Sequence, residues 1–427
     1  MTILVFIGSL IGVMMLGAPV AFALLASGVF LMWQLDLFDP TLIAQNMVDG
    51  ADSFPLLAVP FFILAGEIMN AGGLSRRLID FALTLVGHRK GGLGYVAILA
   101  ALILASISGS AIADTAALGA LLLPMMRRAN YPLGYSAGLI AAGGIIAPII
   151  PPSISLVIFG VVTNTSITSL FLAGIVPGLI LGVGLVLTWI MIVRRTDLPV
   201  APKKTGREVG RAALDAAFAL GMPAIILGGL KTGIFTPTEA AVVAAVYALL
   251  VSTLVYREMS LRQIYACFVD AATTTATVMF LVAATILSSY LMTSAAIPDQ
   301  IVELVGPLRD NPILLMLAIQ VLLLIVGMPL DLTPTILILG PILTPVAVSA
   351  GIDPVYFGVM FVINGCIGLI TPPIGTVLNT ICGAGKVSMD EAARGVLPFI
   401  AAHVFVLLLF TLFPVLVTGP ANFFARM

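Results

Sequence analysis

Carboxylate and hydroxyl side chains gather at four places where glycine or proline interrupts an otherwise apolar stretch. The interruptions read, in chain order, SISGSAIAD (106–114), APIIPPS (147–153), GMPLDLTP (327–334) and ITPPIGT (370–376). A break in a helix leaves backbone carbonyls at one end and free amides at the other, and these dipoles attract cations and anions respectively. Breaks of this kind, rich in oxygen atoms, predict a site that holds monovalent cations beside an anionic substrate.

Asp331 is the most informative of these residues. A charged side chain near the centre of a bilayer costs about 2.5 to 3.5 kcal/mol on insertion scales, and the apolar run around Asp331 contains no basic residue. We therefore expect a bound monovalent cation as its partner, although a first-turn carboxylate can also satisfy the free amides of the following helix. For Asp114 we favour that second, structural role. We interpret Glu67 as a structural or interfacial acid.

Proline pairs mark two of the breaks and reveal an internal repeat. A proline pair removes backbone donors and interrupts the ladder of i to i−4 hydrogen bonds in a membrane helix. In both halves the second proline of the pair lies 25 residues before the proline of a Gly-x-x-Pro motif (177 − 152 and 398 − 373). Other landmarks recur at similar offsets, namely Pro19 with Pro237 (218), Asp114 with Asp331 (217) and Pro152 with Pro373 (221). We infer two copies of one unit.

The elements that carry these breaks are predicted to be membrane helices. The chain has 427 residues, of which 60% are hydrophobic and 9% charged, and its mean hydropathy is +1.19. This balance excludes a soluble fold. Apolar runs long enough to cross about 30 Å of hydrocarbon recur along the whole chain. The first of them lacks a basic n-region and a cleavage site, so we expect it to be a span and not a signal peptide.

Charge patterning predicts how the two copies lie in the membrane. An amphipathic arm after Gly73 carries Arg76 and Arg77, whereas its counterpart at 297–312 carries Asp299 and Glu303. Because basic residues mark the cytoplasmic side, the two arms are expected on opposite faces. The prediction is an all-α polytopic protein with two inverted repeats, each of about five transmembrane helices plus a re-entrant hairpin.

These landmarks divide the chain into five predicted parts. They are residues 1–90 with scaffold spans 1–3 and a cytoplasmic arm helix, 91–193 with the first hairpin and broken helix of a transport domain, 194–211 as a cytoplasmic basic loop, 212–310 with the scaffold spans and periplasmic arm helix of the second repeat, and 311–427 with the second hairpin, broken helix and final span. The segment from Asp36 to Ser53 is predicted to be a polar loop.

Six segments in a fixed order resemble one known family over essentially the whole chain. They read FPLLAVPFFILAGEIMNAGG, SGSAIADTAALGALLLPMM, APIIPPSI, LFLAGIVPG, GIFTPTEAAVVAAVYAL and GLITPPIGTVLN. This set is similar to the large membrane subunit, of the M or DctM type, of tripartite ATP-independent periplasmic (TRAP) transporters. The resemblance implies an elevator-type importer of organic acids in the bacterial inner membrane, coupled to sodium and embedded in membrane lipids.

The resemblance also implies partners and site residues. The partners are a small four-span membrane subunit of the Q or DctQ type and a periplasmic substrate-binding protein of the P or DctP type; no nucleic acid, transition metal or cofactor other than the coupling sodium is expected. By motif match, the sodium-site candidates are Ser108, Gly109, Gly144, Pro148, Asp331, Thr333, Gly365, Gly368 and Thr371. The substrate-site candidates are Ser110, Ser155, Pro372, Thr376 and Asn379.

The sequence narrows the substrate class and leaves two rival functions. Family members that handle sialic acid resemble one another in carrying an arginine before the second hairpin, but here no basic residue lies between Tyr265 and Arg309. A small dicarboxylate or an oxo acid is therefore expected. One rival is a sodium/dicarboxylate symporter that works alone. The other is an intramembrane aspartyl protease, which would need Asp114 and Asp331 to share a proton. The string GAGKVS lacks the glycine spacing of a phosphate loop, so no ATPase is predicted.

Overall fold

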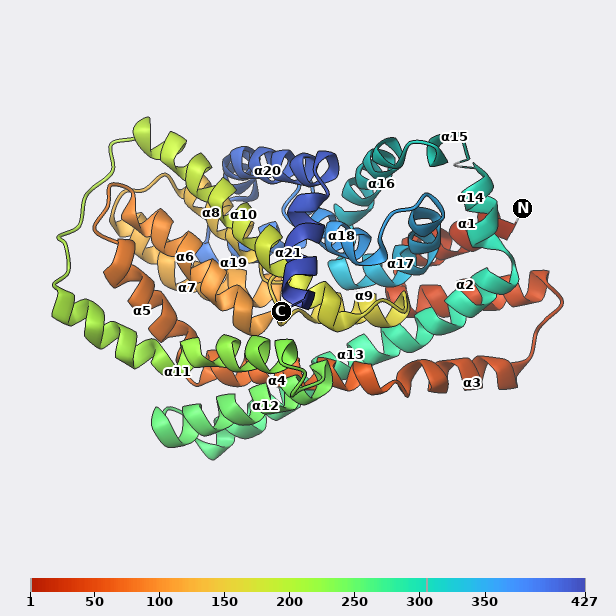
Figure 1. The fold of residues 1–427 in the computed structure, drawn as a ribbon, viewed down its shortest axis with the longest axis horizontal. Coiled ribbons are helices and arrows are strands. Elements are labelled where there is room, and N and C mark those ends of the chain that lie inside the picture. Colours follow the sequence, from red (N-terminus) through yellow and green to blue (C-terminus); the bar gives the residue numbers. More distant parts are fainter. Residues whose placement is uncertain (1, 305, 427) are drawn as a thin grey trace.

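The computed structural model describes residues 2–304 and 306–426, and the regular elements within them are all helices (Figure 1). The helices of the first half are α1 (Thr2–Met15), α2 (Val20–Gln34), α3 (Pro40–Ala51), a 3-10 turn (Phe54–Leu57), α4 (Ala58–Ala71), α5 (Leu74–Val86), α6 (Gly92–Ser108), α7 (Ala111–Arg128), α8 (Leu133–Gly144), α9 (Ile154–Val162) and α10 (Ile167–Arg194).

The second half repeats this order, and a further helix follows it at the C-terminus. Its helices are α11 (Gly206–Lys231), α12 (Pro237–Leu250) with a π-helical end (Val251–Val255), α13 (Leu261–Ser294), α14 (Ile297–Leu304), α15 (Gly306–Arg309), α16 (Pro312–Gly327), α17 (Leu332–Ser349), α18 (Pro354–Gly368), α19 (Thr376–Gly385), α20 (Met389–Leu412) and α21 (Val415–Arg426). In the described residues, seven helices are long and apolar enough to cross a membrane.

All four predicted breaks are confirmed. The hairpins α6–α7 and α16–α17 turn at residues 109–110 and 328–331, which we call the first and the second tip. The broken helices α8–α9 and α18–α19 are interrupted at 145–153 and 369–375. The two proline pairs lie within these interruptions, and the peptide bond inside each pair is cis. Each half therefore contains one hairpin and one broken helix, as the sequence predicts.

The prediction of a polar loop from Asp36 to Ser53 is wrong, because most of this segment forms α3. The Asp39 side chain caps the helix by accepting a hydrogen bond from the Thr41 amide at 2.8 Å, and Pro40 occupies the first helical position. An aspartate followed by proline is a strong helix-start signal. The polar composition of this segment favoured a loop, although the segment forms a helix that packs beside α13.

The structure also corrects the predicted match between Asp114 and Asp331. The helices that follow the two tips begin at Ala111 and Leu332, an offset of 332 − 111 = 221, which equals the offset of the proline pairs. At this offset Asp331 corresponds to Ser110, since both occupy the N-cap position. The earlier offset of 217 matched two residues of the same type at different helical positions.

The two halves pack reciprocally. Helix α4 packs on α12 while its counterpart α13 packs on α2. Helix α5 lies against α11, and α14 contacts α1 through a hydrogen bond between the side chains of Thr2 and Gln300 at 3.3 Å. The arms α5 and α14 lie toward opposite ends of the long axis (Figure 1). This placement is the one that the predicted inversion requires; the orientation of the two halves in a membrane stays a prediction.

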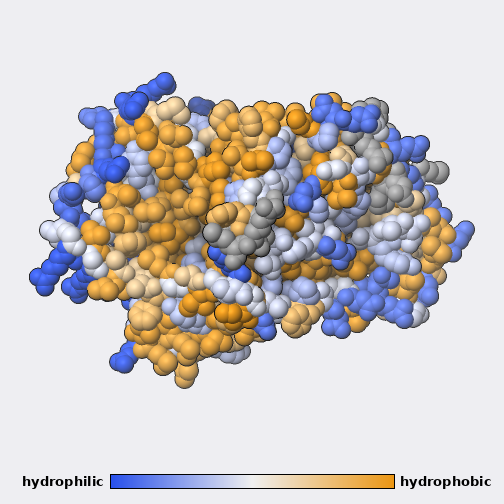
Figure 2. Space-filling view, in the orientation of Figure 1, coloured by the Kyte–Doolittle hydropathy of each residue, from blue (hydrophilic) through white to orange (hydrophobic). Residues whose placement is uncertain are grey.

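Hydrophobic surface lies between the two ends of the molecule. Figure 2 shows hydrophilic residues gathered toward the left and right ends of the long axis, with a broad hydrophobic area over the left half and the lower left. Inside, the broken helices pack closely on the other half, as where α8 meets α20. A Cβ atom on Gly138 would lie 2.6 Å from the carbonyl of Gly395, so this crossing requires glycine.

Candidate functional site

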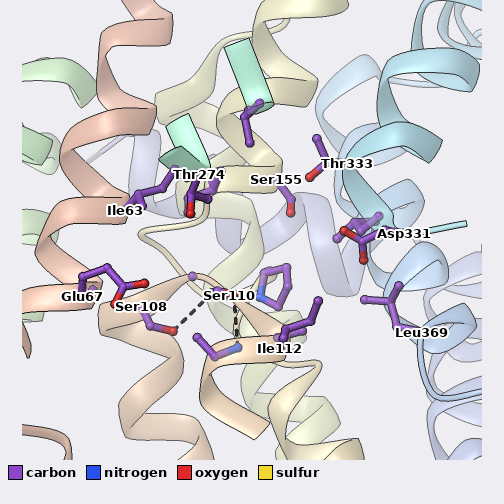
Figure 3. A pocket seen from close by; sticks show the side chains of 18 of the residues that line it. Ile63, Glu67, Ser108, Ser110, Ile112, Ser155, Thr274, Asp331, Thr333 and Leu369 are labelled. Carbon is purple, nitrogen blue, oxygen red and sulfur yellow. Dashed lines mark hydrogen bonds between the residues drawn. The ribbon is translucent and has the colours of Figure 1, made fainter. Parts of the chain in front are cut away.

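A cavity of about 380 Å³ lies where the two hairpin tips approach the broken helices and helices α4 and α13 (Figure 3). Its wall brings together seven of the residues predicted from the sequence, which come from both halves of the chain. They are Ser108, Gly109, Ser110, Pro148, Ser155, Asp331 and Thr333. Residues separated by more than 200 positions in the sequence therefore face one space.

The first tip is a closed hydrogen-bonded turn. Helix α6 ends at Ser108, and Gly109 then adopts a left-handed conformation with φ of 62°. The Ser108 hydroxyl donates to the carboxylate of Asp114 and accepts from the Ser110 amide at 3.2 Å. The Ser110 hydroxyl caps α7 by accepting from the Ala113 amide at 3.4 Å. Asp114 is 1% exposed and does not line the cavity.

The first broken helix fits tightly against this tip. A Cβ atom on Gly109 would lie 2.5 Å from the carbonyl oxygen of Pro152, so glycine is required here for its small size as well as for its conformation. Ser153 begins α9 by accepting from the Leu156 amide at 3.1 Å, and its hydroxyl donates to the carbonyl of Pro148. Gly144 lies under the tip beside Thr115 and does not reach the cavity wall.

The second tip leaves its acidic side chain more available. Asp331 is the N-cap of α17, but its side chain makes no capping hydrogen bond. The carboxylate accepts a long hydrogen bond from the hydroxyl of Thr376 at 3.4 Å. Thr376 thus approaches the site through Asp331, although it does not line the cavity itself. Figure 3 shows Asp331 and Glu67 on opposite sides of the view, with Ser110 and Ser155 between them.

The other predicted residues of the second break support the tip from outside the cavity. A Cβ atom on Gly368 would lie 2.9 Å from the Cα of Gly327, and one on Gly365 would lie 2.5 Å from the Leu332 side chain. The remaining candidates, Thr371, Pro372 and Asn379, also lie outside the wall. The Thr371 hydroxyl donates to the Ile367 carbonyl at 2.7 Å, and the Asn379 amide donates to the Ile374 carbonyl at 2.9 Å.

Helices α4 and α13 form a further side of the cavity, whose residues were not among the candidates predicted from the sequence. Helix α4 contributes Ile63, Glu67 and Asn70, and α13 contributes Thr274. The interpretation of Glu67 as a structural or interfacial acid did not place its side chain in the cavity wall, where the structure has it. The signal was present, since residues 63, 67 and 70 have the i, i+4, i+7 spacing of one helix face.

The electrostatics of the wall are unusual for a protein that would bind an anion. The side chains of Glu67 and Asp331 both line the cavity, and none of its described lining residues is Lys, Arg or His. The favourable groups for an anion are the first turns of three helices, which face the cavity through Ile112 of α7, Ser155 of α9 and Thr333 of α17. Helix N-termini carry partial positive charge.

The wall presents oxygen atoms. Among the described residues, no group of three His, Cys, Asp or Glu side chains is placed to hold a metal ion. The oxygen atoms that face the cavity include the carboxylates of Glu67 and Asp331 and the hydroxyls of the serine and threonine residues in the wall. Hard monovalent cations accept such ligands, whereas transition metals favour nitrogen and sulfur. The geometry also gives no support to proteolysis, because Asp114 and Asp331 bond to different hydroxyls and only Asp331 faces the cavity.

Comparison with known proteins gives the same family over nearly the whole chain. The family described as "Tripartite ATP-independent periplasmic transporter, DctM component" matches residues 7–416. The chain is 54% identical over 420 residues to the 2,3-diketo-L-gulonate TRAP transporter large permease protein YiaN of Escherichia coli K12, covering 98% of this chain and 99% of that protein. It is 38% identical over 381 residues to the C4-dicarboxylate TRAP transporter large permease protein DctM of Pseudomonas aeruginosa, covering 88% and 89%.

A solved structure shares the fold at low sequence identity. The crystal structure of the Alcanivorax borkumensis YdaH transporter, described as having an unusual topology, aligns with a TM-score of 0.62 and 13% identity. The alignment covers 86% of each chain. At this identity the likeness concerns the arrangement of the helices alone.

Proposed function

Because the chain belongs to the large-permease family of TRAP transporters, we propose that it imports an organic acid in symport with sodium. The observation that carries this proposal is the cavity wall, which presents two carboxylates, several hydroxyls and three helix N-termini to a substrate but no basic side chain among the residues described. An anion does not enter such a cavity favourably by itself. Cations must neutralise the wall first.

The size of the repulsion supports this order of binding. Two unit negative charges 4 Å apart repel by about 4 kcal/mol at an effective dielectric constant of 20. The partial charge at one helix N-terminus offsets only about 0.3 to 2 kcal/mol of this. A sodium ion beside Asp331 cancels the charge of that carboxylate and removes its repulsion, which supports coupling between sodium and substrate.

We assign the cations to the two tips and the substrate to the space between them. In the first half, the Ser108–Gly109 turn and the carbonyls of the break that starts after Gly144 supply oxygen ligands. In the second half, Asp331, Thr333 and the carbonyls from Gly365 to Thr371 supply them. The substrate carboxylate then rests on the first turns of α7, α9 and α17, with Ser110 and Ser155 as hydroxyl donors.

The proposed substrate class is an oxo acid that carries hydroxyl groups. Serine, threonine and asparagine side chains in the wall can each donate and accept hydrogen bonds with hydroxyl and keto oxygens. The 54% identical relative is named for 2,3-diketo-L-gulonate, which belongs to this class. Dicarboxylates are the second candidate class, because the relative from Pseudomonas aeruginosa is named for them.

The proposal includes partners and a movement. A small four-span membrane subunit and a periplasmic substrate-binding protein complete the transporter in the bacterial inner membrane. The hairpins and broken helices move as one domain against the scaffold, which includes α4 and α13. Each net charge that crosses with the potential contributes about 2.3 kcal/mol per 100 mV.

Reconstitution tests the coupling. The full chain, with the small subunit and binding protein, is placed in proteoliposomes, and uptake of a radiolabelled oxo acid is measured with an inward sodium gradient. We expect uptake to stop when potassium replaces sodium at equal ionic strength. Unchanged uptake in potassium would overturn the coupling. Full uptake without the binding protein would instead support a symporter that works alone.

A further inference from the structure

A second cavity of about 390 Å³ lies between the arm helix α5 and the scaffold, away from the site described above. It is lined by Arg76, Arg77, Asp80, Ala212, Asp215, Tyr256 and Glu258. These residues come from α5, from α11 and from the connection between α12 and α13. The cavity therefore lies between the arm and the scaffold, and no residue of the proposed substrate site lines it.

Some of the residues that line this cavity already interact with one another. Arg77 donates to the carboxylate of Glu258 at 2.6 Å and stacks over the Tyr256 ring at 3.8 Å from its centroid. The Tyr256 hydroxyl donates to the backbone carbonyl of Asp215 at 2.7 Å. These interactions join the start of α5 to the scaffold, and the charges of Arg77 and Glu258 neutralise each other in the ion pair.

The remaining charged side chains of the cavity form no salt bridge within the part of the chain described. Arg76 on α5, Asp80 one turn later and Asp215 on α11 are exposed and belong to none of the salt bridges found among the described residues, although Arg76 lies near enough to Glu258 to help lower the pKa of that carboxyl. After Arg77 and Glu258 cancel, one positive and two negative groups face the cavity. This pattern suits a ligand with a phosphate and an ammonium group close together, and not a simple anion or a simple cation.

The position of the cavity points to a lipid as the source of such a ligand. Exposed apolar side chains lie close to the lining residues in the sequence, including Leu214 beside Asp215 at 75% exposure and Leu254 in the π-helical end of α12 at 65%. Figure 2 shows the hydrophobic surface at the lower left meeting hydrophilic residues at the left end, where Figure 1 places α5 and the start of α11. Phospholipid headgroups lie at such a boundary, with acyl chains along the apolar side.

We propose that this cavity binds the headgroup of phosphatidylethanolamine, with the phosphate on Arg76 and the ammonium between Asp80 and Asp215. A primary ammonium donates three hydrogen bonds, which two carboxylates on different helices accept. Because Asp80 belongs to the arm and Asp215 to the scaffold, one lipid molecule bridges the two. The bound lipid thereby stabilises the docking of α5 on α11.

Lipid competition tests the headgroup chemistry. The full chain in detergent is mixed with equal amounts of phosphatidylethanolamine, phosphatidylcholine and phosphatidylglycerol of identical acyl chains, and native mass spectrometry counts the bound lipids. Phosphatidylcholine keeps the positive charge but cannot donate from nitrogen, and phosphatidylglycerol lacks the positive charge. We expect phosphatidylethanolamine to be retained about threefold to tenfold over either, the sum of two or three exposed charge contacts.

Variants locate the lipid in this cavity. Arg76→Gln should lower retention of all three lipids, because it removes the phosphate contact. The double variant Asp80→Asn with Asp215→Asn should remove the preference over phosphatidylcholine and keep the phosphate contact. Arg394→Gln is the matched control, since Arg394 pairs with Asp390 at 3.0 Å on another exposed surface. Size-exclusion elution confirms that each variant is folded before lipids are counted.

Several results would overturn the proposal. Equal retention of the three lipids, or an unchanged preference in the double variant, would remove the ammonium site. Displacement of the lipid by inorganic phosphate at low millimolar concentration would show an anion site in place of a lipid site. As an independent readout, phosphatidylethanolamine should raise the thermal unfolding temperature of the wild-type chain and of Arg394→Gln more than that of the double variant.

Discussion

The two hairpin tips occupy equivalent places in the two halves, yet they differ in how far their polar groups are satisfied. At the first tip, Ser110 caps α7, and Ser108 bonds to the buried Asp114. At the second tip, the N-cap is Asp331, which does not cap its helix and instead faces the cavity with one long contact to Thr376. Equivalent hairpin tips thus present a closed carboxylate in one half and an available one in the other.

The helices behind the tips also differ in their hydrogen bonds. In the second half, the Asn364 amide donates to the Gln320 carbonyl at 2.9 Å, and the Gln320 amide donates to the Thr411 hydroxyl at 2.6 Å. Helix starts give offsets of 220, 221 and 222 for these positions, so their first-half counterparts are Ala100, Gly143 and Trp189. At these three positions, the half with the available carboxylate carries a chain of hydrogen bonds between helices.

The arms are joined to the opposite half by different chemistry. Arm α5 is held by the ion pair of Arg77 with Glu258, whereas α14 contacts α1 through the neutral pair of Thr2 and Gln300. The comparison teaches that the repeat conserves backbone geometry and lets side-chain chemistry diverge. Function should therefore be unequally divided between the halves.

The largest difference is expected between variants of the two aspartates, Asp331 and Asp114. Asp331→Asn is expected to reduce sodium-dependent uptake about 10- to 100-fold, because a contact to a charged group contributes roughly 1.5 to 3 kcal/mol. Asp114→Asn should change sodium dependence less and lower thermal stability more, since Asp114 is buried against Ser108. Sodium titration of uptake and thermal unfolding measure the two effects. An equal loss of sodium dependence in both variants would contradict the unequal division.

Backbone packing behind the tips should give the next effect. Gly368→Ala places a methyl group about 2.9 Å from the backbone of Gly327, and overpacking of this kind costs about 1 to 3 kcal/mol. Gly144→Ala should cost a similar amount, because its added Cβ would lie 1.9 Å from the hydroxyl of the buried Thr115. Gly383→Ala is the control, since nothing lies within 4 Å of its added Cβ. Unfolding temperatures in detergent rank the three variants, and a neutral Gly368→Ala would show that the second tip is loosely packed.

The hydrogen-bonded chain of Asn364, Gln320 and Thr411 should contribute less. Gln320→Met keeps the side-chain length and removes the hydrogen bond to Thr411, and such bonds in membrane proteins average about 0.6 kcal/mol. Thr188→Val in the first half is the matched control, because its hydroxyl bonds only to the Gly184 carbonyl of its own helix. Thermal unfolding of both variants is the measurement. A larger loss in Thr188→Val would show that the bond between helices contributes less than a hydrogen bond within one helix.

The smallest effect concerns the arm contact and its pH dependence. The hydrogen bond from Arg77 lowers the pKa of Glu258 below its usual value. The ion pair therefore adds stability above the unfolded pKa of about 4.3, and this stability is lost as pH falls through the lower folded pKa. Because Glu258 is 45% exposed, the gain is under about 1 kcal/mol. The difference in unfolding temperature between wild type and Arg77→Gln should stay constant above pH 6 and should shrink between pH 5 and about pH 3. If the difference persists at about pH 3, the stability that Arg77 contributes comes from stacking on Tyr256 and not from the ion pair.

Local sequence was sufficient for much of this fold. Hydropathy predicted the membrane helices, and Gly109, the proline pairs and the Gly327–Asp331 turn predicted the breaks. These signals act within a few residues of the backbone, where proline removes a donor and glycine permits left-handed conformations. The helix α3 was missed because its cap signal, Asp39 with Pro40, was weighed less than its polar composition.

The sequence by itself determined where the helices break and which oxygen-bearing residues stand at the breaks, because these properties depend on neighbours along the chain. Only the tertiary structure decided which of those residues share a cavity. It placed Asp331 at the wall and Asp114 beneath the tip, and it brought Glu67 and Thr274 across from them. The physical reason is that helix rotation and the packing of one half on the other set the direction of a side chain, and neither is encoded in local spacing.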